Sequence, residues 1–262
     1  MAALPSGSRA VMRILITGAS SGVGAAAANI FASRLAFENR KAHLVLTGRK
    51  EDALKRIADK IVESHGEYVQ VSVVTGDVSV ASDVEAVCRA AKTAWSDATC
   101  DVAVLNAGLN RTGPVEAMAE SDYDTVMNVN VKGVFLFLRE LLGGMKESGS
   151  GQVVVTSSVL GARGAPNASL YCASKYALEG MVDAIRLELK GTGVKIGSIR
   201  PGAIATPWWT DSSRGGRPKE APAPAEETML TPEAVADAIV MMSLQAPSSD
   251  LRVLELEPTG RS

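Results

Sequence analysis

Residues 17–24 read Thr17-Gly18-Ala19-Ser20-Ser21-Gly22-Val23-Gly24, and no other segment says as much about the architecture. They follow an apolar run at 13–17 that has the length of a buried strand, and they open a segment of helical period near 22–38. Glycines at a strand-to-helix turn let backbone N–H groups approach a pyrophosphate, and the helix N-terminus adds a favourable dipole. The segment therefore predicts a dinucleotide-binding β-α-β unit.

The rest of the chain continues this alternation of strand-length apolar runs and segments of helical period. The predicted strands lie at 13–17, 43–47, 69–75, 102–106, 152–157, 194–199 and 252–256. The predicted helices lie near 22–38, 50–64, 80–95, 121–147, 169–190 and 231–243. We therefore expect an α/β fold, a single doubly wound three-layer Rossmann-type domain with a seven-stranded parallel sheet.

No internal repeat and no linker divides the chain, so we expect one domain over residues 11–262 behind a flexible N-terminal tail at 1–10. A weak organellar presequence is the alternative for the tail. Segment 203–229 departs from the alternation of strands and helices, because it is rich in proline, holds two tryptophans and has little periodicity. We expect a substrate-binding loop or lid there, with a disordered surface insertion as the alternative.

Composition and charge argue against several classes of partner. The 262 residues are 46% hydrophobic and 21% charged, as in ordinary soluble globular proteins. The net charge is −2 and the basic residues are scattered, so we expect no nucleic-acid partner. The longest apolar run, at 134–138, is too short to span a bilayer, so we expect no membrane partner.

The three cysteines are Cys88, Cys100 and Cys172. Their spacing is not that of a metal site, so we expect no metal. They suit a reducing compartment, so we expect a cytoplasmic location.

The end of the second predicted strand bears on the choice of cofactor. An acid there would hold the adenosine ribose of NAD, but the chain reads Thr47-Gly48-Arg49-Lys50. Arg49 can bind a 2′-phosphate with two parallel hydrogen bonds, so we expect NADP(H) to be preferred over NAD(H). The alternative is that Arg49 and Lys50 are only the solvated start of a helix.

Two further groups follow predicted strands. Asp77 and Val78 come after the third strand, and Asn106-Ala107-Gly108 ends the fourth. Each is also a common turn or cap residue. Their position at the carboxyl ends of strands, where doubly wound sheets bind ligands, makes them predicted cofactor contacts.

The predicted helix at 169–190 carries a pair with chemical meaning. Tyr171 and Lys175 are four residues apart and share one helix face, with Ser158 thirteen residues upstream of the tyrosine. A neighbouring ammonium favours the phenolate and would lower the pKa of Tyr171. A chance pairing on an ordinary amphipathic helix is the alternative, but it would not require a serine at that distance. The trio predicts proton transfer to or from a carbonyl or alcohol oxygen.

These elements resemble the short-chain dehydrogenase/reductase family from residue 17 to about residue 259. The resemblance rests on 17–24, Asp77, 106–108, Asn130, Ser158, Tyr171-x-x-x-Lys175 and Pro201-Gly202 with Thr206. It implies an NAD(P)-binding catalytic domain with the catalytic residues Asn130, Ser158, Tyr171 and Lys175. It implies cofactor contacts at Gly18, Ser20, Ser21, Gly22, Val23, Gly24, Arg49, Asp77, Val78, Asn106, Ala107, Gly108, Tyr171, Lys175, Pro201, Gly202, Ile204 and Thr206.

The resemblance also implies a role for each catalytic group. Tyr171 would move the proton, Ser158 would hydrogen-bond the substrate oxygen, and Lys175 would hold the nicotinamide ribose. Asn130 would keep a relay water in place, although an Asn on a helix can simply face solvent or bond its own backbone. Ser157 could replace Ser158, but its spacing to Tyr171 is one residue off. The substrate would meet Ser158, Tyr171, Trp208 and Trp209.

Three departures from the family pattern bear on substrate and cofactor. Leu105 stands where many members have an asparagine, Ser21 replaces the basic residue often found in the glycine loop of NADP enzymes, and the C-terminus lacks a Gly-Gly ending. That C-terminus looks more like the branch acting on 3-hydroxy acids. The resemblance thus implies an NADP(H)-dependent oxidoreductase for a small carbonyl or secondary alcohol, in a homodimer or homotetramer formed through the helices at 121–147 and 169–190.

The sequence alone is also compatible with two other functions. A reductase of acyl-carrier-protein-bound 3-oxo esters would need a basic patch, for which the sequence offers Arg111, Arg163, Arg214, Arg217 and Lys219. A non-catalytic dinucleotide-binding regulator would keep the fold without a reaction, and it has no evident use for Tyr171 beside Ser158.

Overall fold

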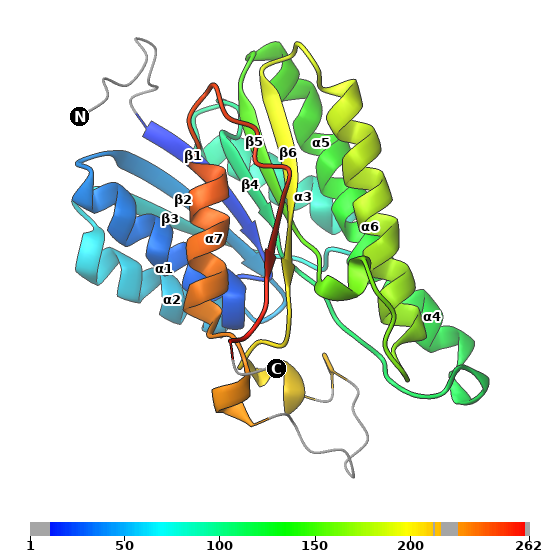
Figure 1. Ribbon diagram of the computed structural model, residues 1–262. Helices are drawn as coiled ribbons and strands as arrows, with labels where there is room; N and C mark the ends of the chain where they lie inside the picture. The colour runs from blue at the N-terminus through cyan, green and yellow to red at the C-terminus, as the bar shows by residue number, and fades with distance from the viewer. Residues whose placement is uncertain (1–10, 212, 216–224, 260–262) are drawn as a thin grey trace.

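Seven parallel strands form one sheet in the order β3-β2-β1-β4-β5-β6-β7 (Figure 1). The computed structural model describes residues 11–211, 213–215 and 225–259. The strands are β1 (Val11–Thr17), β2 (Lys41–Gly48), β3 (Val69–Thr75), β4 (Val102–Leu105), β5 (Gly151–Thr156), β6 (Val194–Pro201) and β7 (Val253–Leu256). All seven predicted strands are confirmed, with ends that differ by at most two residues.

Helices cover both faces of the sheet and make the predicted three layers (Figure 1). One side packs α1 (Gly22–Phe37), α2 (Glu51–His65) and α7 (Pro232–Ser243). The other side packs α3 (Ala81–Ala94), α5 (Gly133–Glu147) and α6 (Ser169–Glu188). The short α4 (Glu120–Met127) precedes α5 in the chain.

Successive side chains of β1 pack alternately against the helices on the two faces of the sheet. Ile14 and Ile16 belong to the apolar cluster under α1 and α7, while Leu15 belongs to the cluster on the opposite face. All three side chains are fully buried. Because successive side chains of a strand point to opposite faces, a strand covered by helices on both sides must be apolar throughout.

The predicted helix at 121–147 differs from the structure. It is divided by a π-helical turn at Asn128–Lys132, which separates α4 from α5. Asn130 in this turn is fully buried and bonds the backbone of Leu109 instead of facing solvent. A wider turn of this kind is common at functional sites, since it redirects a side chain without ending the helix.

The sheet order reverses between β1 and β4, so the loops after these strands diverge and leave a crevice at the strand carboxyl ends. The described parts of segment 203–229 lie at this end of the sheet and contain two short 3₁₀ helices, Pro207–Trp209 and Glu226–Thr228. The remainder of that segment and the predicted tail at 1–10 lie outside the described residues. Among the helices that the structure describes, none is long and apolar enough to cross a membrane.

Candidate active site

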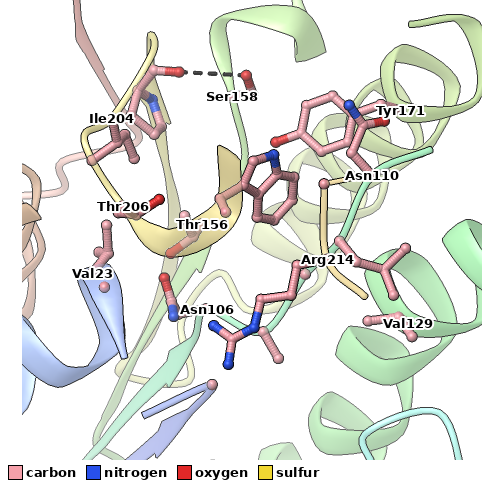
Figure 2. A pocket seen from close by; sticks show the side chains of 18 of the residues that line it. Val23, Asn106, Asn110, Val129, Thr156, Ser158, Tyr171, Ile204, Thr206 and Arg214 are labelled. Carbon is pink, nitrogen blue, oxygen red and sulfur yellow. Dashed lines mark hydrogen bonds between the residues drawn. The ribbon is translucent and has the colours of Figure 1, made fainter. Parts of the chain in front are cut away.

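A cavity of about 450 Å³ opens at the carboxyl ends of the strands (Figure 2). Its walls come from the glycine loop after β1, the ends of β2 to β6, the first turns of α6 and the loop after β6. All of the predicted catalytic, cofactor-binding and substrate-binding residues line this cavity except Gly24 and Asn130. In the part of the chain that the structure describes, no group of three or more His, Cys, Asp and Glu side chains could hold a metal ion.

The glycine loop has the geometry that a phosphate cradle requires. Gly18 and Gly22 adopt φ values of +66° and +54°, which side chains other than glycine rarely adopt. A Cβ on Gly24 would lie 2.4 Å from the carbonyl oxygen of Gly18, so α1 can start this close to the loop only without a side chain. The loop, its open face and the N-terminus of α1 therefore fit a dinucleotide pyrophosphate.

A buried threonine joins the glycine loop to the end of β4. Thr17 Oγ1 accepts hydrogen bonds from Asn106 N at 2.9 Å and from Ala107 N at 3.1 Å. Asn106 Nδ2 also lies 3.3 Å from the carbonyl oxygen of Thr17. These bonds hold two predicted cofactor loops in fixed relation. This role of Thr17 was not predicted from the sequence, although a polar residue at the end of a buried strand is a signal for it.

Tyr171 and Ser158 face each other across the cavity. Figure 2 shows the Tyr171 phenol pointing toward Ser158 Oγ. Ser158 Oγ accepts a hydrogen bond from Leu160 N at 3.1 Å and lies 3.4 Å from the carbonyl oxygen of Pro201. Ser157, the alternative, has its buried Oγ close to Gly161, 2.8 Å from where a Cβ on that glycine would lie. The geometry favours Ser158 as the partner of Tyr171.

Lys175 lies beneath the tyrosine, one helical turn further along α6. Its Nζ is 5.4 Å from the centre of the Tyr171 ring and donates a hydrogen bond to the carbonyl oxygen of Thr156 at 2.8 Å. The side chain is buried, with 3% of the residue exposed. Burial lowers the pKa of Lys175 to about 8, and the negative charge of Glu179 acts in the opposite direction. The predicted proximity of the two side chains is confirmed.

The predicted lowering of the tyrosine pKa is wrong for the protein alone. Burial raises the pKa of Tyr171 to about 12, and the hydrogen bond with the Ser158 side chain only partly offsets this. Desolvation of the phenolate is thus the largest influence on this pKa, and the ammonium of Lys175, 5.4 Å from the ring centre, does not reverse it. The phenol is therefore protonated at neutral pH.

Asn130 lies beside the cavity, where it bonds the loop after β4 and α6. Its Oδ1 accepts from Leu109 N at 2.8 Å, and its Nδ2 lies 2.9 Å from the Leu109 carbonyl oxygen and 3.0 Å from Ser174 Oγ. The Ser174 hydroxyl in turn donates to the carbonyl oxygen of Tyr171 at 2.8 Å. The amide therefore ties the loop after β4 to the helix that carries Tyr171. Its predicted role in holding a relay water stays a prediction.

The predicted adenosine end of the site is lined by residues after β2 and β3. Arg49 lines the cavity, and among the described residues it has no hydrogen-bond or ion-pair partner. Asp77 also lines the cavity, but its Oδ1 accepts from Ser79 N at 2.9 Å and from Ser79 Oγ at 2.6 Å. Asp77 is thus both a turn residue and part of the wall.

The loop after β6 closes the other side of the cavity. The Trp208 ring meets the Tyr171 ring edge to face, with centroids 5.8 Å apart. Trp209 also lines the cavity, while its Nε1 donates to the carbonyl oxygen of Ile204 at 2.7 Å. Thr206 packs against the glycine loop, since its Cγ2 would lie 3.2 Å from a Cβ on Gly22. The segment after β6 therefore touches both the catalytic trio and the cofactor cradle.

Comparison with known proteins agrees with this geometry. A family model described as short chain dehydrogenase matches residues 12–215. The chain belongs to the short-chain dehydrogenase/reductase family. It is 31% identical to a sepiapterin reductase from Chlorobaculum tepidum over 94% of this chain and 96% of that protein. It is 34% identical to a glucose 1-dehydrogenase from Gluconobacter oxydans over 89% of this chain and 85% of that protein.

A solved structure of an alcohol dehydrogenase shows the same fold. The alcohol dehydrogenase from the archaeon Thermococcus sibiricus, solved in complex with 5-hydroxy-NADP, is 28% identical with a TM-score of 0.82. The match covers 96% of this chain and 98% of that chain. The protein is therefore an oxidoreductase of this family that acts on alcohol or carbonyl groups and binds a nicotinamide dinucleotide.

Proposed function

We propose that the protein is an NADP(H)-dependent oxidoreductase that interconverts a small carbonyl compound and its secondary alcohol. The observation that carries the proposal is the trio at one wall of the cavity, where the Tyr171 phenol faces Ser158 Oγ and lies over the Lys175 ammonium. A protonated tyrosine next to a second hydroxyl is the arrangement that an oxygen gaining negative charge requires.

In the reduction direction, Tyr171 gives its proton to the carbonyl oxygen of the substrate. Hydride comes from the nicotinamide ring when the cofactor is bound. Ser158 Oγ donates a hydrogen bond to the same oxygen as its negative charge develops. Lys175, which is protonated at neutral pH, stabilises the phenolate that remains until solvent returns a proton. Oxidation runs through the same groups in reverse.

The surrounding residues position this chemistry. Asn130 and Ser174 hold the loop after β4 against α6, so the phenol and the cofactor loop keep one relative position. Trp208 covers the tyrosine ring and narrows the cavity above it. An apolar cover of this kind excludes water and strengthens the hydrogen bonds at the reacting oxygen.

The preference for NADP(H) is part of the proposal. Arg49 at the end of β2 has no partner among the described residues and lines the cavity where the adenosine ribose of a bound dinucleotide would lie. Its guanidinium would bind a 2′-phosphate with two hydrogen bonds. The Thermococcus sibiricus relative, which was solved with 5-hydroxy-NADP, supports the same choice.

The substrate we propose is a small ketone or secondary alcohol, with small 3-hydroxy acids within the class. A reductase of carrier-bound 3-oxo esters stays the alternative, but its basic patch has little support. Arg111 pairs with Asp122 at 3.4 Å, and Arg163 pairs with Glu257. Arg214 turns inward to the glycine loop. Arg217 and Lys219 lie outside the described residues.

A single conservative change tests the reaction. Tyr171→Phe removes the proton donor and keeps the ring under Trp208, so we expect NADPH-dependent reduction of a ketone and aldehyde panel to fall by about 10²–10⁴-fold. Binding of NADPH should change little, which fluorescence titration measures. Tyr176→Phe, at a half-exposed position on the same helix, is the matched control. Turnover by Tyr171→Phe at the parent rate would refute the mechanism, whereas a parent protein that binds NADPH but reduces no compound of the panel would favour the non-catalytic regulator.

We also propose a homodimer or homotetramer through α5 and α6. Four large apolar side chains on α4, α5 and α6 are about half exposed, namely Tyr123, Phe135, Tyr176 and Leu187. Such exposed residues on neighbouring helices fit an interface between copies. A cytoplasmic location is proposed from the cysteines, since Cys88, Cys100 and Cys172 are all free. Light scattering with size-exclusion chromatography measures the oligomeric state.

A further inference from the structure

Arg214 belongs to the loop after β6, yet its side chain reaches the glycine loop at the far wall of the cavity (Figure 2). Nη1 donates a hydrogen bond to Ser21 Oγ, and Nη2 lies 3.5 Å from Ser20 Oγ. The carbonyl oxygen of Arg214 accepts from Asn110 N at 2.7 Å, so the backbone is held as well. The side chain is 21% exposed. The guanidinium is therefore a fixed part of the cavity wall.

This is an unfavourable place for a lone cation. Ser21 is the N-cap of α1, and the first turn of that helix carries no acidic residue. The N-terminus of a helix bears a positive partial charge, which repels a guanidinium and attracts an anion. The arrangement of Arg214 therefore calls for an anion close by.

One carboxylate meets that need in the protein itself. Asp211 Oδ2 lies 3.3 Å from Arg214 Nε and 3.3 Å from Lys50 Nζ. Lys50 is the N-cap of α2, directly after β2. The hydrogen bond from the Ser213 hydroxyl, with a further contribution from Lys50, holds the pKa of Asp211 below its usual value, so the carboxylate is charged. Two cations from distant segments thus share one anion at the cavity rim.

The site lies where the glycine loop meets the end of β2. Ser20 Oγ lies 3.6 Å from the position of a Cβ on Gly48. Arg49, the next residue, lines the cavity without a partner among the described residues. Arg214 and Lys50 therefore meet at Asp211, and Arg49 lines the same cavity, in the part proposed above for the adenosine ribose.

We propose that Arg214, together with Lys50, binds the 2′-phosphate of NADP(H), and that Asp211 holds these two cations until the phosphate replaces it. The inference rests on the proposed NADP(H) function, because the 2′-phosphate is what distinguishes this cofactor from NAD(H). The glycine loop has Ser21 and no basic residue, and a cation 193 residues away supplies the charge. The segment after β6 that carries Arg214 also carries Trp208, which contacts the Tyr171 ring, so one segment would meet both the phosphate and the substrate end of the cavity.

Binding of adenosine fragments to the full-length protein tests this without any turnover. Calorimetry compares 2′,5′-ADP with 5′-AMP, which lacks the 2′-phosphate. We expect Arg214→Gln to weaken the binding of 2′,5′-ADP by about 10-fold, which corresponds to the loss of at least one charge-assisted hydrogen bond. The affinity for 5′-AMP should change by less than about 2-fold. Arg214→Lys should recover part of the affinity. Arg34→Gln, at an exposed position near the far end of α1, is the control for loss of one charge.

The second variant tests the exchange. Asp211→Asn removes the competing carboxylate, so we expect tighter binding of 2′,5′-ADP by about 3-fold and no change for 5′-AMP. Weaker binding by Asp211→Asn would overturn the exchange. If Arg214→Gln left the ratio of the affinities for 2′,5′-ADP and 5′-AMP unaltered, the proposed role of Arg214 would be overturned. A parent protein that does not prefer 2′,5′-ADP would instead contradict the NADP(H) preference in the proposed function.

Discussion

The two walls of the cavity are built in different ways. The α6 wall carries Tyr171 and Lys175 on a long helix, where backbone hydrogen bonds and buried contacts such as that of Lys175 with Thr156 fix the side chains. The described part of the loop wall after β6 has no long helix and is held at separate points, through the indole of Trp209, the ion pairs of Asp211 and the backbone bond between Asn110 and Arg214. The proposed proton transfer, which tolerates little displacement, lies on the helical wall, and the proposed recognition of the ligands lies on the loop.

The strongest test of the rigid wall is Lys175→Met, which keeps the length of the side chain and removes its charge. The phenolate left after proton transfer would then lie in a buried site without a cation, so we expect kcat to fall by about 10³-fold. Steady-state kinetics with saturating NADPH measures it. A fall of less than 10-fold would mean that the lysine is not needed beneath the tyrosine, and the contrast between the walls would lose its main support.

Asn130→Ala tests whether the π-helical turn is what positions α6. The change leaves Leu109 N, the Leu109 carbonyl oxygen and Ser174 Oγ without their partner in a buried place, so we expect about 1–3 kcal/mol of lost stability. Activity should fall by about 10-fold with no change in the pH profile of kcat. Urea unfolding gives the stability. Asn128→Ala, at an exposed position of the same turn, is the control and should change neither quantity.

On the loop wall, Trp208→Ala should have a smaller effect, and one confined to the substrate. The ring packs edge to face against Tyr171 and is not among the groups proposed to move the proton, so we expect KM for the carbonyl substrate to rise by about 10-fold and KM for NADPH to stay constant. Removal of both Trp208 and Trp209 should abolish quenching of tryptophan fluorescence by bound product. An unaltered KM in Trp208→Ala would place the substrate elsewhere in the cavity.

The last prediction concerns stability against pH in the absence of ligands. The pKa of Lys175 is lowered from 10.5 to about 8 in the folded protein, so between these values the unfolded chain binds more protons and stability rises with pH. The pKa of Tyr171 is raised from 10.0 to about 12, so above pH 10 stability falls again. Thermal unfolding of Lys175→Met should lack the rise between pH 8 and 10 that the parent shows. Parallel curves would mean that burial of the ammonium has no energetic cost.

Local sequence patterns were enough to predict the strands, the loop and the helix face that form the candidate site. The seven strands, the glycine loop and the shared face of Tyr171 and Lys175 all follow from periodicities of two and of 3.6 residues, which hold wherever a segment lies in the fold. Position relative to strand ends then predicted that Asp77 and Asn106 line one cavity. No local pattern predicted the π-helical turn, whose buried Asn130 bonds Leu109, 21 residues away in the chain.

Two further facts about the site came only from packing. The direction in which the Tyr171 pKa shifts depends on how much water the cavity walls exclude. A spacing of four residues along the chain carries no information about this exclusion. The contact of Arg214 with Ser21 joins segments 193 residues apart through a loop without periodicity. Residue types and spacing were thus sufficient to assign the fold and the family, and to predict which groups react. Distances across the cavity decided which charges meet, because desolvation and Coulomb energies depend on the surroundings in space and not on neighbours along the chain.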